Sequence, residues 1–256
     1  MPDFNQRLTR RRKIIMFIKF GKEQHLRSLM DRGEIWFNPS IKFRTWEKNE
    51  GVKDKNDGGI RTKCEKTKIF DYEGHSLYLG EGNISYIIQP AKQTPVFCLF
   101  QTEEILLDII NDIKREFPSY NYALIIEDEM EFLENIRFSF RNKAFCHNVF
   151  YQDEINLDYN EFLFNGQSDV RFYEPKKKNR YYAYIENKDS NGTVRHIFID
   201  DSNFYRTMFK KGSNYKSQRE YRIVLPFERI EQGKIYKIKP FKAVLVNIDD
   251  LVDKNY

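Results

Sequence analysis

A glutamate near the end of the 256-residue chain has the sequence context expected of a catalytic carboxylate. Glu220 opens a predicted strand in the segment YKSQREYRIVL. Because side chains alternate along a strand, Glu220 and Arg222 share one face, whereas Ile223 and Leu225 make the other face apolar. A carboxylate held in this way could point into a cleft and stabilise a developing cation or orient a sugar hydroxyl. The structural alternative is a cross-strand ion pair between Glu220 and a basic neighbour.

A second candidate lies near the beginning of the chain, in the segment KFGKEQHLRSLMDRGEIWFNPSIKFR. Gly21 follows a short run of β-branched and aromatic residues, which predicts a buried strand that ends in a turn. Since glycine has no Cβ, its backbone can approach a ligand closely and pair with a planar amide such as nicotinamide. A plain tight turn would explain the same glycine.

Together the two segments resemble the ADP-ribosyltransferase superfamily. The shared order is a strand, a glycine, a helix, a second glycine, an aromatic strand followed by a serine and an aromatic residue, and a late glutamate that opens a strand. The resemblance covers these two segments of the chain. Within GEIWFNPSIKF the matching residues are Gly33, Trp36, Phe37, Ser40 and Phe43.

The resemblance implies an enzyme that consumes NAD and transfers ADP-ribose. In that family a first-strand residue and the adjacent glycine clamp nicotinamide, an aromatic ring stacks on it, and the late glutamate promotes cleavage of the bond between nicotinamide and ribose. The implied NAD-binding residues are Lys19, Phe20, Gly21, Trp36, Ser40 and Phe43, and the implied catalytic residues are Glu220 and Gln218.

The chain departs from the family pattern at three of these positions. Phe20 stands where most members have His or Arg, with Lys19 one residue earlier. Phe43 replaces the Tyr of many members, so its ring could stack on nicotinamide without donating a hydrogen bond. Gln218 precedes Glu220 by two residues, where members that modify Arg have a second Glu. A Gln there is similar to members that modify Asn or nucleic-acid bases, so the implied acceptor is a nucleic acid or a protein.

A third group of residues combines cations with flat rings, as single-stranded nucleic-acid grooves do. Solvated lysine-rich loops would explain the same composition. This group favours a second function, that of a non-catalytic nucleic-acid-binding or sensor module of a defence system. A nuclease is a weaker third hypothesis, because no carboxylate cluster has metal-binding spacing. The residues are Lys177, Lys178, Arg180, Tyr182, Lys210, Lys211 and Tyr215.

The remaining motifs limit the cellular context and the cofactors. Cys64, Cys98 and Cys146 have no CxxC or CxxH neighbour, so neither a disulfide framework nor a metal site is expected. The apolar run at 14–18 is too short for a signal peptide, and no run is long enough to span a membrane. We therefore expect a cytoplasmic protein with NAD as consumed substrate, no metal and no membrane partner. Its expected role is that of a toxin or antiphage effector, for which a neutralising antitoxin is a candidate partner.

The elements that must position these residues are mostly strands. A chain that is 40% hydrophobic and 16% aromatic can bury a large core, and a net charge of +5 permits binding to polyanions without requiring it. Consecutive strands predict an α+β fold with a mixed, mainly antiparallel β core and a few flanking helices, which the resemblance refines to ADP-ribosyltransferase-like. We expect a single domain over 1–256, a basic N-terminal arm at 1–13 and a mobile loop at 38–59.

Hydrophobic periodicity gives the expected boundaries of these elements. Helices are expected over 22–32, 103–117 and 129–140. Strands are expected over 14–20, 34–37, 60–70, 76–79, 84–88, 96–101, 122–126, 145–151, 181–185, 194–199, 220–225, 235–238 and 243–248.

Overall fold

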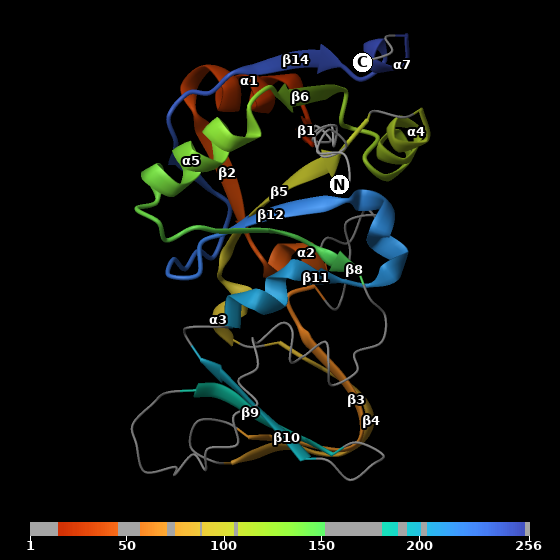
Figure 1. The fold of residues 1–256 in the computed structure, drawn as a ribbon, viewed down its shortest axis with the longest axis vertical. Helices are drawn as coiled ribbons and strands as arrows, with labels where there is room; N and C mark the ends of the chain where they lie inside the picture. The colour runs from red at the N-terminus through yellow and green to blue at the C-terminus, as the bar shows by residue number, and fades with distance from the viewer. Residues whose placement is uncertain are drawn as a thin grey trace, which may run out of the picture.

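An eight-stranded sheet forms the upper part of the protein in the computed structural model, as drawn in Figure 1. The structure describes residues 15–45, 57–70, 75–87, 89–104, 107–151, 181–188, 194–200 and 204–253. The basic arm at 1–13 and residues 46–56 of the predicted loop lie outside these ranges. The strands of the main sheet are β1 (Met16–Gly21), β2 (Glu34–Pro39), β5 (Pro95–Thr102), β6 (Tyr122–Ile126), β7 (Phe145–Asn148), β12 (Glu220–Val224), β13 (Lys234–Lys237) and β14 (Ala243–Asn247).

The strand order is β13-β2-β5-β1-β6-β14, with β12 beside β5 and β7 beside β12. Every pairing described in this sheet is antiparallel. A parallel pair is formed by the short strands β8 (Phe150–Tyr151) and β11 (Lys210–Lys211). These pairings confirm the predicted mixed α+β fold with a mainly antiparallel sheet.

Helices cover both faces of this sheet. On one face α1 and α5 bury Leu26, Leu29, Phe132 and Ile136 in a core that includes Phe17 of β1. On the other face lie α4 and α7, whose core includes Ile18 and Phe20 of β1. The side chains of β1 therefore alternate between the two cores. The helices are α1 (Glu23–Arg32), α2 (Ile41–Thr45), α3 (Gln89–Lys92), α4 (Leu107–Glu116), α5 (Glu129–Ser139) and α7 (Asp250–Asp253), and the 3-10 helices are η2 (Phe204–Phe209) and η3 (Ser213–Gln218).

Strand β5 is the element around which the site is built. Phe100 pairs with Ile18 of β1 on one edge and with Glu220 of β12 on the other. Val96 likewise pairs with Asn38 of β2 on the first edge, opposite β12. Strands β1 and β2 therefore share one edge of β5 and occupy its two ends. Between these two pairings, this edge of β5 has no strand partner among the described residues. The wedge is this unpaired stretch of β5, from which β1 and β2 diverge.

The turn between α1 and β2 requires glycine. Gly33 adopts a left-handed φ of 62°, and its N–H donates to the Leu29 carbonyl at the end of the helix. A Cβ at this position would lie 2.2 Å from the carbonyl oxygen of Ile238, which no side chain can tolerate. The predicted end of this helix at residue 32 is confirmed, and β2 begins directly after Gly33.

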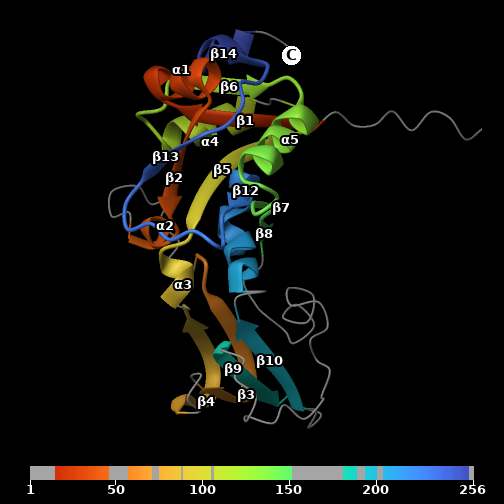
Figure 2. The same ribbon diagram turned by 90° about the vertical axis from the view of Figure 1, so that its left-hand side faces the viewer.

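A second, four-stranded sheet extends from the lower part of the molecule (Figure 2). Its order is β10-β9-β3-β4, with all pairs antiparallel. The two strands predicted at 76–79 and 84–88 are one strand, because Gly80 and Gly82 pair with β3 across an irregularity in place of forming a turn. Its strands are β3 (Ile60–Phe70), β4 (Ser76–Tyr86), β9 (Tyr181–Lys188) and β10 (Val194–Asp200).

The loop predicted at 38–59 is only partly a loop. Its first residues complete β2 and form α2, because Ser40 donates its N–H to the Thr94 carbonyl and its hydroxyl to the Ala91 carbonyl. At the other end Asp57 and Gly58 form a turn, in which Asp57 is fully buried. Both ends of the predicted loop are thus attached to the sheet.

Candidate functional site

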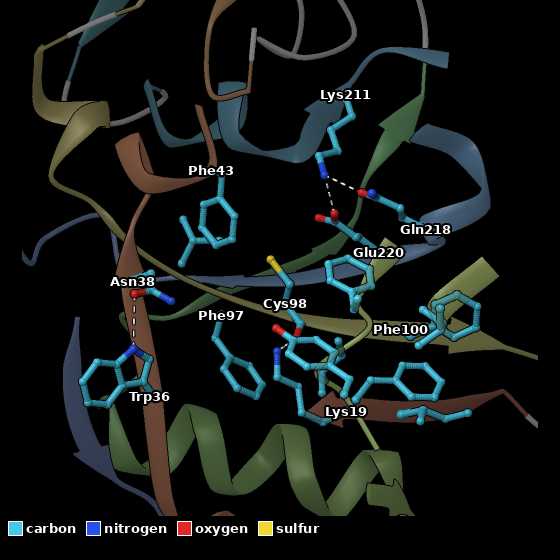
Figure 3. A pocket seen from close by; sticks show the side chains of 17 residues that line it. Lys19, Trp36, Asn38, Phe43, Phe97, Cys98, Phe100, Lys211, Gln218 and Glu220 are labelled. Atoms are coloured by element: carbon cyan, nitrogen blue, oxygen red, sulfur yellow. Dashed lines mark hydrogen bonds and ion pairs between the residues drawn. The ribbon is translucent and has the colours of Figure 1, made fainter. Parts of the chain in front are cut away.

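A pocket of about 140 Å³ lies at the wedge between β1 and β2 (Figure 3). It is mainly apolar and aromatic, with a few polar groups, which is the usual composition of a small-molecule site. It opens on the face of the sheet that carries α4. Its lining residues are Ile18, Lys19, Phe20, Trp36, Asn38, Phe43, Val96, Phe97, Cys98, Leu99, Phe100, Ile113, Phe117, Tyr120, Lys211, Gln218 and Glu220.

Most of the residues predicted for an NAD site meet in this pocket. From the beginning of the chain come two residues of β1, one of β2 and one of α2, and from the end come two residues around β12. These residues are Lys19, Phe20, Trp36, Phe43, Gln218 and Glu220. The cross-strand row Ile18, Phe100 and Glu220 places the carboxylate on the same face as Phe20, because residues two apart on a strand face the same side.

Two predicted residues do not line the pocket. Gly21 ends β1 beside Tyr122, and a Cβ there would meet Leu26 of α1 at 3.4 Å, an ordinary van der Waals distance. Packing against α1 therefore does not require a glycine at position 21, and Gly21 does not border the pocket. Ser40 is buried, and its hydrogen bonds to Ala91 and Thr94 attach α2 to α3. Ser40 thus supports the wall that carries Phe43 without contacting the pocket.

Glu220 is held by two cations. Its Oε1 accepts a hydrogen bond from Lys211 Nζ at 2.5 Å, and its Oε2 accepts one from Arg222 Nε at 2.7 Å. Its backbone N–H donates to the Tyr151 hydroxyl at 2.6 Å. The side chain is 13% exposed. The ion pair considered as a structural alternative is present, and the same carboxylate also borders the pocket.

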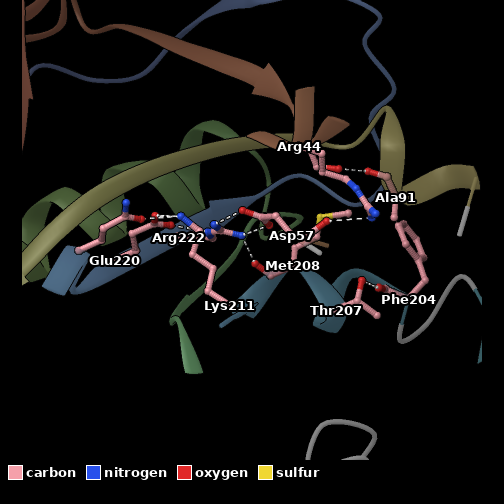
Figure 4. A network of polar contacts seen from close by, with 11 residues as sticks. Arg44, Asp57, Ala91, Phe204, Thr207, Met208, Lys211, Glu220 and Arg222 are labelled. Atoms are coloured by element: carbon pink, nitrogen blue, oxygen red, sulfur yellow. Dashed lines mark hydrogen bonds and ion pairs between the residues drawn. The ribbon is translucent and has the colours of Figure 1, made fainter. Parts of the chain in front are cut away.

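A buried ion pair extends this network away from the pocket (Figure 4). Arg222 is 1% exposed and binds both carboxylate oxygens of Asp57 at 2.6 Å. Its guanidinium also donates to the Met208 carbonyl at 2.5 Å. Arg222 therefore links the turn at Asp57 and the end of η2 to the carboxylate of Glu220.

These cations keep Glu220 ionised. Burial acts to raise the pKa of Glu220, but the charges of Arg222 and Lys211 and their hydrogen bonds outweigh burial and lower the pKa to about 2. Because the folded pKa lies below the ordinary value of 4.5, the stabilisation is complete above that value and is lost as the pH falls toward 2.

Acid should therefore destabilise the wild type more than a Glu220→Gln variant. Between about pH 5 and pH 2 we expect an additional loss of about 3 kcal/mol in the free energy of unfolding of the wild type. Urea unfolding at several pH values measures it. Parallel pH profiles for the two proteins would contradict the ion-pair network around Glu220.

Gln218 belongs to the same network. Its Oε1 accepts from Lys211 Nζ at 2.6 Å, and its Nε2 donates to Glu116 of α4 at 3.1 Å. The next residue, Arg219, has a left-handed φ of 40° and ends η3. Lys211 thus bridges the two residues that the resemblance assigned to catalysis.

The predicted nucleic-acid groove needs correction at two residues. Lys210 and Lys211 are 4% and 3% exposed, since β11 packs between β8 and the network of Glu220. Lys211 lies 5.1 Å from the ring of Tyr215, but it faces the carboxylate and not solvent. Lys177, Lys178 and Arg180 lie outside the described residues. Tyr182 lies in β9, and its side chain is outside the description.

The unpaired edge of β5 is closed by a lysine. Lys19 Nζ donates to the Cys98 carbonyl at 2.7 Å and lies 4.6 Å from the centre of the Phe97 ring. Burial lowers the pKa of Lys19, although the nearby charge of Glu220 acts to raise it. Burial raises the pKa of the Cys98 thiol to about 12, so Cys98 contributes a protonated thiol to the pocket.

Several residues of the site were not predicted from the sequence. Asp57 gave no signal, because it lies in a segment of polar composition without periodicity. Lys211 was assigned to a different surface, since adjacent lysines suggest solvent. Strand alternation did indicate that Arg222 shares the face of Glu220, but their direct contact follows from the structure.

Comparison with protein-family models, with curated proteins and with solved structures yields no match to this chain. In the part of the chain that the structure describes, no group of three or more His, Cys, Asp or Glu side chains could hold a metal ion. Among the same residues, no helix is both long and apolar enough to cross a membrane.

Proposed function

We propose that the protein is an NAD-consuming ADP-ribosyltransferase that acts as a toxin or antiphage effector on a nucleic-acid or protein acceptor. The observation that carries the proposal is the pocket itself, which joins Phe20 and Phe43 from the first matching segment to Glu220 and Gln218 from the second. These segments are distant in the sequence and were selected by their resemblance to one family. Their convergence in one pocket supports that resemblance.

The lining of the pocket fits the nicotinamide end of NAD. Aromatic rings offer flat apolar walls for a planar heterocycle, and Phe43 stands at one side with Phe100 at the other. Glu220 lies between these walls as an ionised carboxylate. A carboxylate can accept about four hydrogen bonds, so Glu220 can accept a ribose hydroxyl while it keeps Lys211 and Arg222.

The reaction would break the bond between the nicotinamide nitrogen and C1′ of ribose. The bonding electron pair leaves with nicotinamide, which becomes neutral, and positive charge develops on the ribose carbon and ring oxygen. A fixed negative charge stabilises that charge without reorganising during the reaction. An acceptor nucleophile then forms a bond to C1′ and loses its proton. Lys211 and Arg222 act as positioning residues, because they hold both oxygens of Glu220.

The function is tested by incubating the purified protein with labelled NAD and separate RNA, DNA and protein fractions of a cell lysate. We expect free nicotinamide to appear and the ADP-ribose label to enter one fraction. Salt-sensitive binding to RNA or DNA without NAD consumption would replace this proposal with the nucleic-acid-binding alternative. Magnesium-dependent cleavage of nucleic acid would replace it with a nuclease.

Phe43 should contribute to NAD binding through its ring. The Phe43→Ala variant removes the stacking surface, and we expect the KM for NAD to rise about tenfold with a smaller change in kcat. Phe43→Tyr keeps the ring and serves as the matched control, with a KM near that of the wild type. Steady-state nicotinamide release measures both constants. Equal KM values for Phe43→Ala and the wild type would exclude Phe43 as the stacking residue.

A further inference from the structure

The pocket of Glu220 has room for only one ring of a larger ligand. Its volume is about 140 Å³. Pockets that enclose a whole drug-sized molecule typically measure about 300–1,000 Å³. A nicotinamide ring can enter the pocket, but the rest of a dinucleotide must lie outside it, on the rim. The groups on the rim therefore decide what else the protein binds beside this pocket.

Trp36 forms the rim of the pocket on the side of β2. Its side chain lines the pocket, and 49% of the residue is nevertheless exposed. Ile235 of β13 pairs with Trp36 across the sheet and is 50% exposed. Because residues that pair in this way face the same side, the two side chains form one apolar surface that continues from the pocket. We call the surface formed by Trp36 and Ile235 the Trp36 platform.

Two contacts fix the indole of this platform. Trp36 Nε1 donates to Asn38 Oδ1 at 3.2 Å, and Asn38 also lines the pocket. The ring lies against the backbone of Gly233, where a Cβ would come within 2.2 Å of an indole carbon. Gly233 does not have the positive φ that would itself require glycine, so the missing Cβ makes room for the ring. The indole is thus held in place before a ligand arrives, which lowers the entropy cost of binding.

The Trp36 platform lies on the same face of the sheet as Glu220. Trp36 and Asn38 face the same side of β2, and Asn38 pairs with Val96 of β5. Farther along the same face of β5, Phe100 pairs with Glu220. Two strand spacings separate β12 from β2 across β5, so Trp36 lies about 10 Å or more from Glu220. Figure 3 shows the two side chains on opposite sides of the pocket, so a single ring cannot contact both of them.

From this geometry we propose that the Trp36 platform stacks a nucleobase of the ligand that occupies the neighbouring pocket. The base lies flat on the indole, as bases do on the aromatic platforms of single-strand-binding proteins. This site rests on the proposed function, because NAD and a nucleic-acid acceptor each bring a base to the pocket. The adenine of NAD and an unpaired base of the acceptor have the same chemistry, and the experiment below separates these two sources.

Tryptophan fluorescence reports the stack directly. The chain has two tryptophans, so Trp46→Phe leaves Trp36 as the only one. Excitation at the red edge of the tryptophan band avoids absorption by the bases. We expect a probe that carries a base to quench the emission of Trp36 in a saturable manner, and its base-free match to leave the emission unchanged. The first pair of probes is AMP and ribose 5-phosphate, and the second is a short single-stranded DNA and the same strand with abasic residues.

The two pairs of probes identify the source of the base. Tighter binding of AMP than of the DNA identifies the adenine of NAD as the stacked ring, and the reverse order identifies a base of the acceptor. No quenching by AMP or by the DNA, or equal quenching by their base-free matches, would overturn the proposal. Release of nicotinamide from NAD is measured separately. Quenching without this release retains the platform and removes the transferase, whereas release without quenching retains the transferase and removes the platform.

Replacing Trp36 assigns the binding to the indole. In titration calorimetry Trp36→Leu should weaken binding of the base-carrying probe by at least about fivefold, which corresponds to the lower end of what one stacked base contributes. Phe138→Leu is the matched control, because it removes a ring from α5 that is 68% exposed and does not line the pocket. This control should bind the probe as the wild type does. Wild-type affinity in Trp36→Leu would overturn the proposal.

Gly233→Ala tests whether the position of the indole matters. The added methyl group would occupy the space of the ring and displace it, while every side chain that could contact a base stays in the protein. We expect the affinity for the base-carrying probe to fall several-fold. The melting temperature should stay close to that of the wild type, because the half-exposed ring of Trp36 can move into solvent. Unchanged affinity in this variant would contradict a platform that is formed before the ligand binds.

Discussion

Replacing Glu220 with Gln should reduce the rate of nicotinamide release from NAD by about 10²- to 10³-fold, with a small change in the KM for NAD. Glutamine keeps the size of the side chain and a carbonyl oxygen in the pocket, but it removes the negative charge that would face the ribose. The loss should therefore fall on kcat, since the charge matters most when positive charge develops on the sugar. Single-turnover release of labelled nicotinamide at saturating NAD measures the effect.

The same substitution also affects stability, so the two effects must be separated. Glu220→Gln leaves Lys211 facing a neutral group and removes one of the two carboxylates that Arg222 contacts. Circular dichroism and urea unfolding give the folded fraction at the assay temperature, to which each rate is normalised. Glu134→Gln, on the exposed side of α5, is the control for removing a negative charge. If normalised Glu220→Gln released nicotinamide as fast as the wild type, Glu220 would not be the catalytic carboxylate.

Replacing Asp57 with Asn should cost about 3–5 kcal/mol of the free energy of unfolding. Asp57 is fully buried and is the bidentate partner of Arg222, which is itself 1% exposed. Without it the guanidinium would retain Glu220 and the Met208 carbonyl, but one buried positive charge would no longer be balanced. The denaturant midpoint and slope in urea unfolding measure the loss.

A double-mutant cycle shows whether the loss comes from this pair. Asp57→Leu combined with Arg222→Met removes both charges, so the double variant should be more stable than the sum of the two single losses implies. We expect a coupling energy above about 1 kcal/mol. Additive losses, or a cost below about 1 kcal/mol for Asp57→Asn, would contradict the buried pair as the attachment of the Asp57 turn to β12.

Local signals predicted most of the secondary structure. The periodic apolar residues of α1 are a property of a short segment, and the helix that they predict over 22–32 matches α1, which Gly33 ends. Errors arose where tertiary pairing overrides local composition. Two strands were predicted at 76–79 and 84–88, but pairing with β3 includes Gly80 and Gly82 and makes one strand of them. The polar composition of 38–59 suggested a loop, whereas residues 41–45 form α2, and hydrogen bonds from Ser40 to Ala91 and Thr94 attach the start of this segment.

The sequence by itself determined the chemical types available for a site: aromatic residues in the segment after Gly21, and a carboxylate at the start of a strand that Arg222 shares. The resemblance built on them selected two segments that do meet in one pocket. It could not exclude Gly21 and Ser40 from that pocket, because their neighbours in the fold, Leu26 and Ala91, belong to other elements.

Only the tertiary structure decided what surrounds the carboxylate. Asp57 is distant from β12 in sequence and lies in a segment without periodicity, yet it binds Arg222. Lys211 precedes Glu220 by 9 residues, but only the packing of β11 beside β12 turns its amine toward the carboxylate. The wedge that makes the pocket likewise exists because β1 and β2 share one edge of β5 at opposite ends. The charge and shape of a site depend on contacts between different segments of the chain. The composition of one segment does not determine which other segments will pack against it.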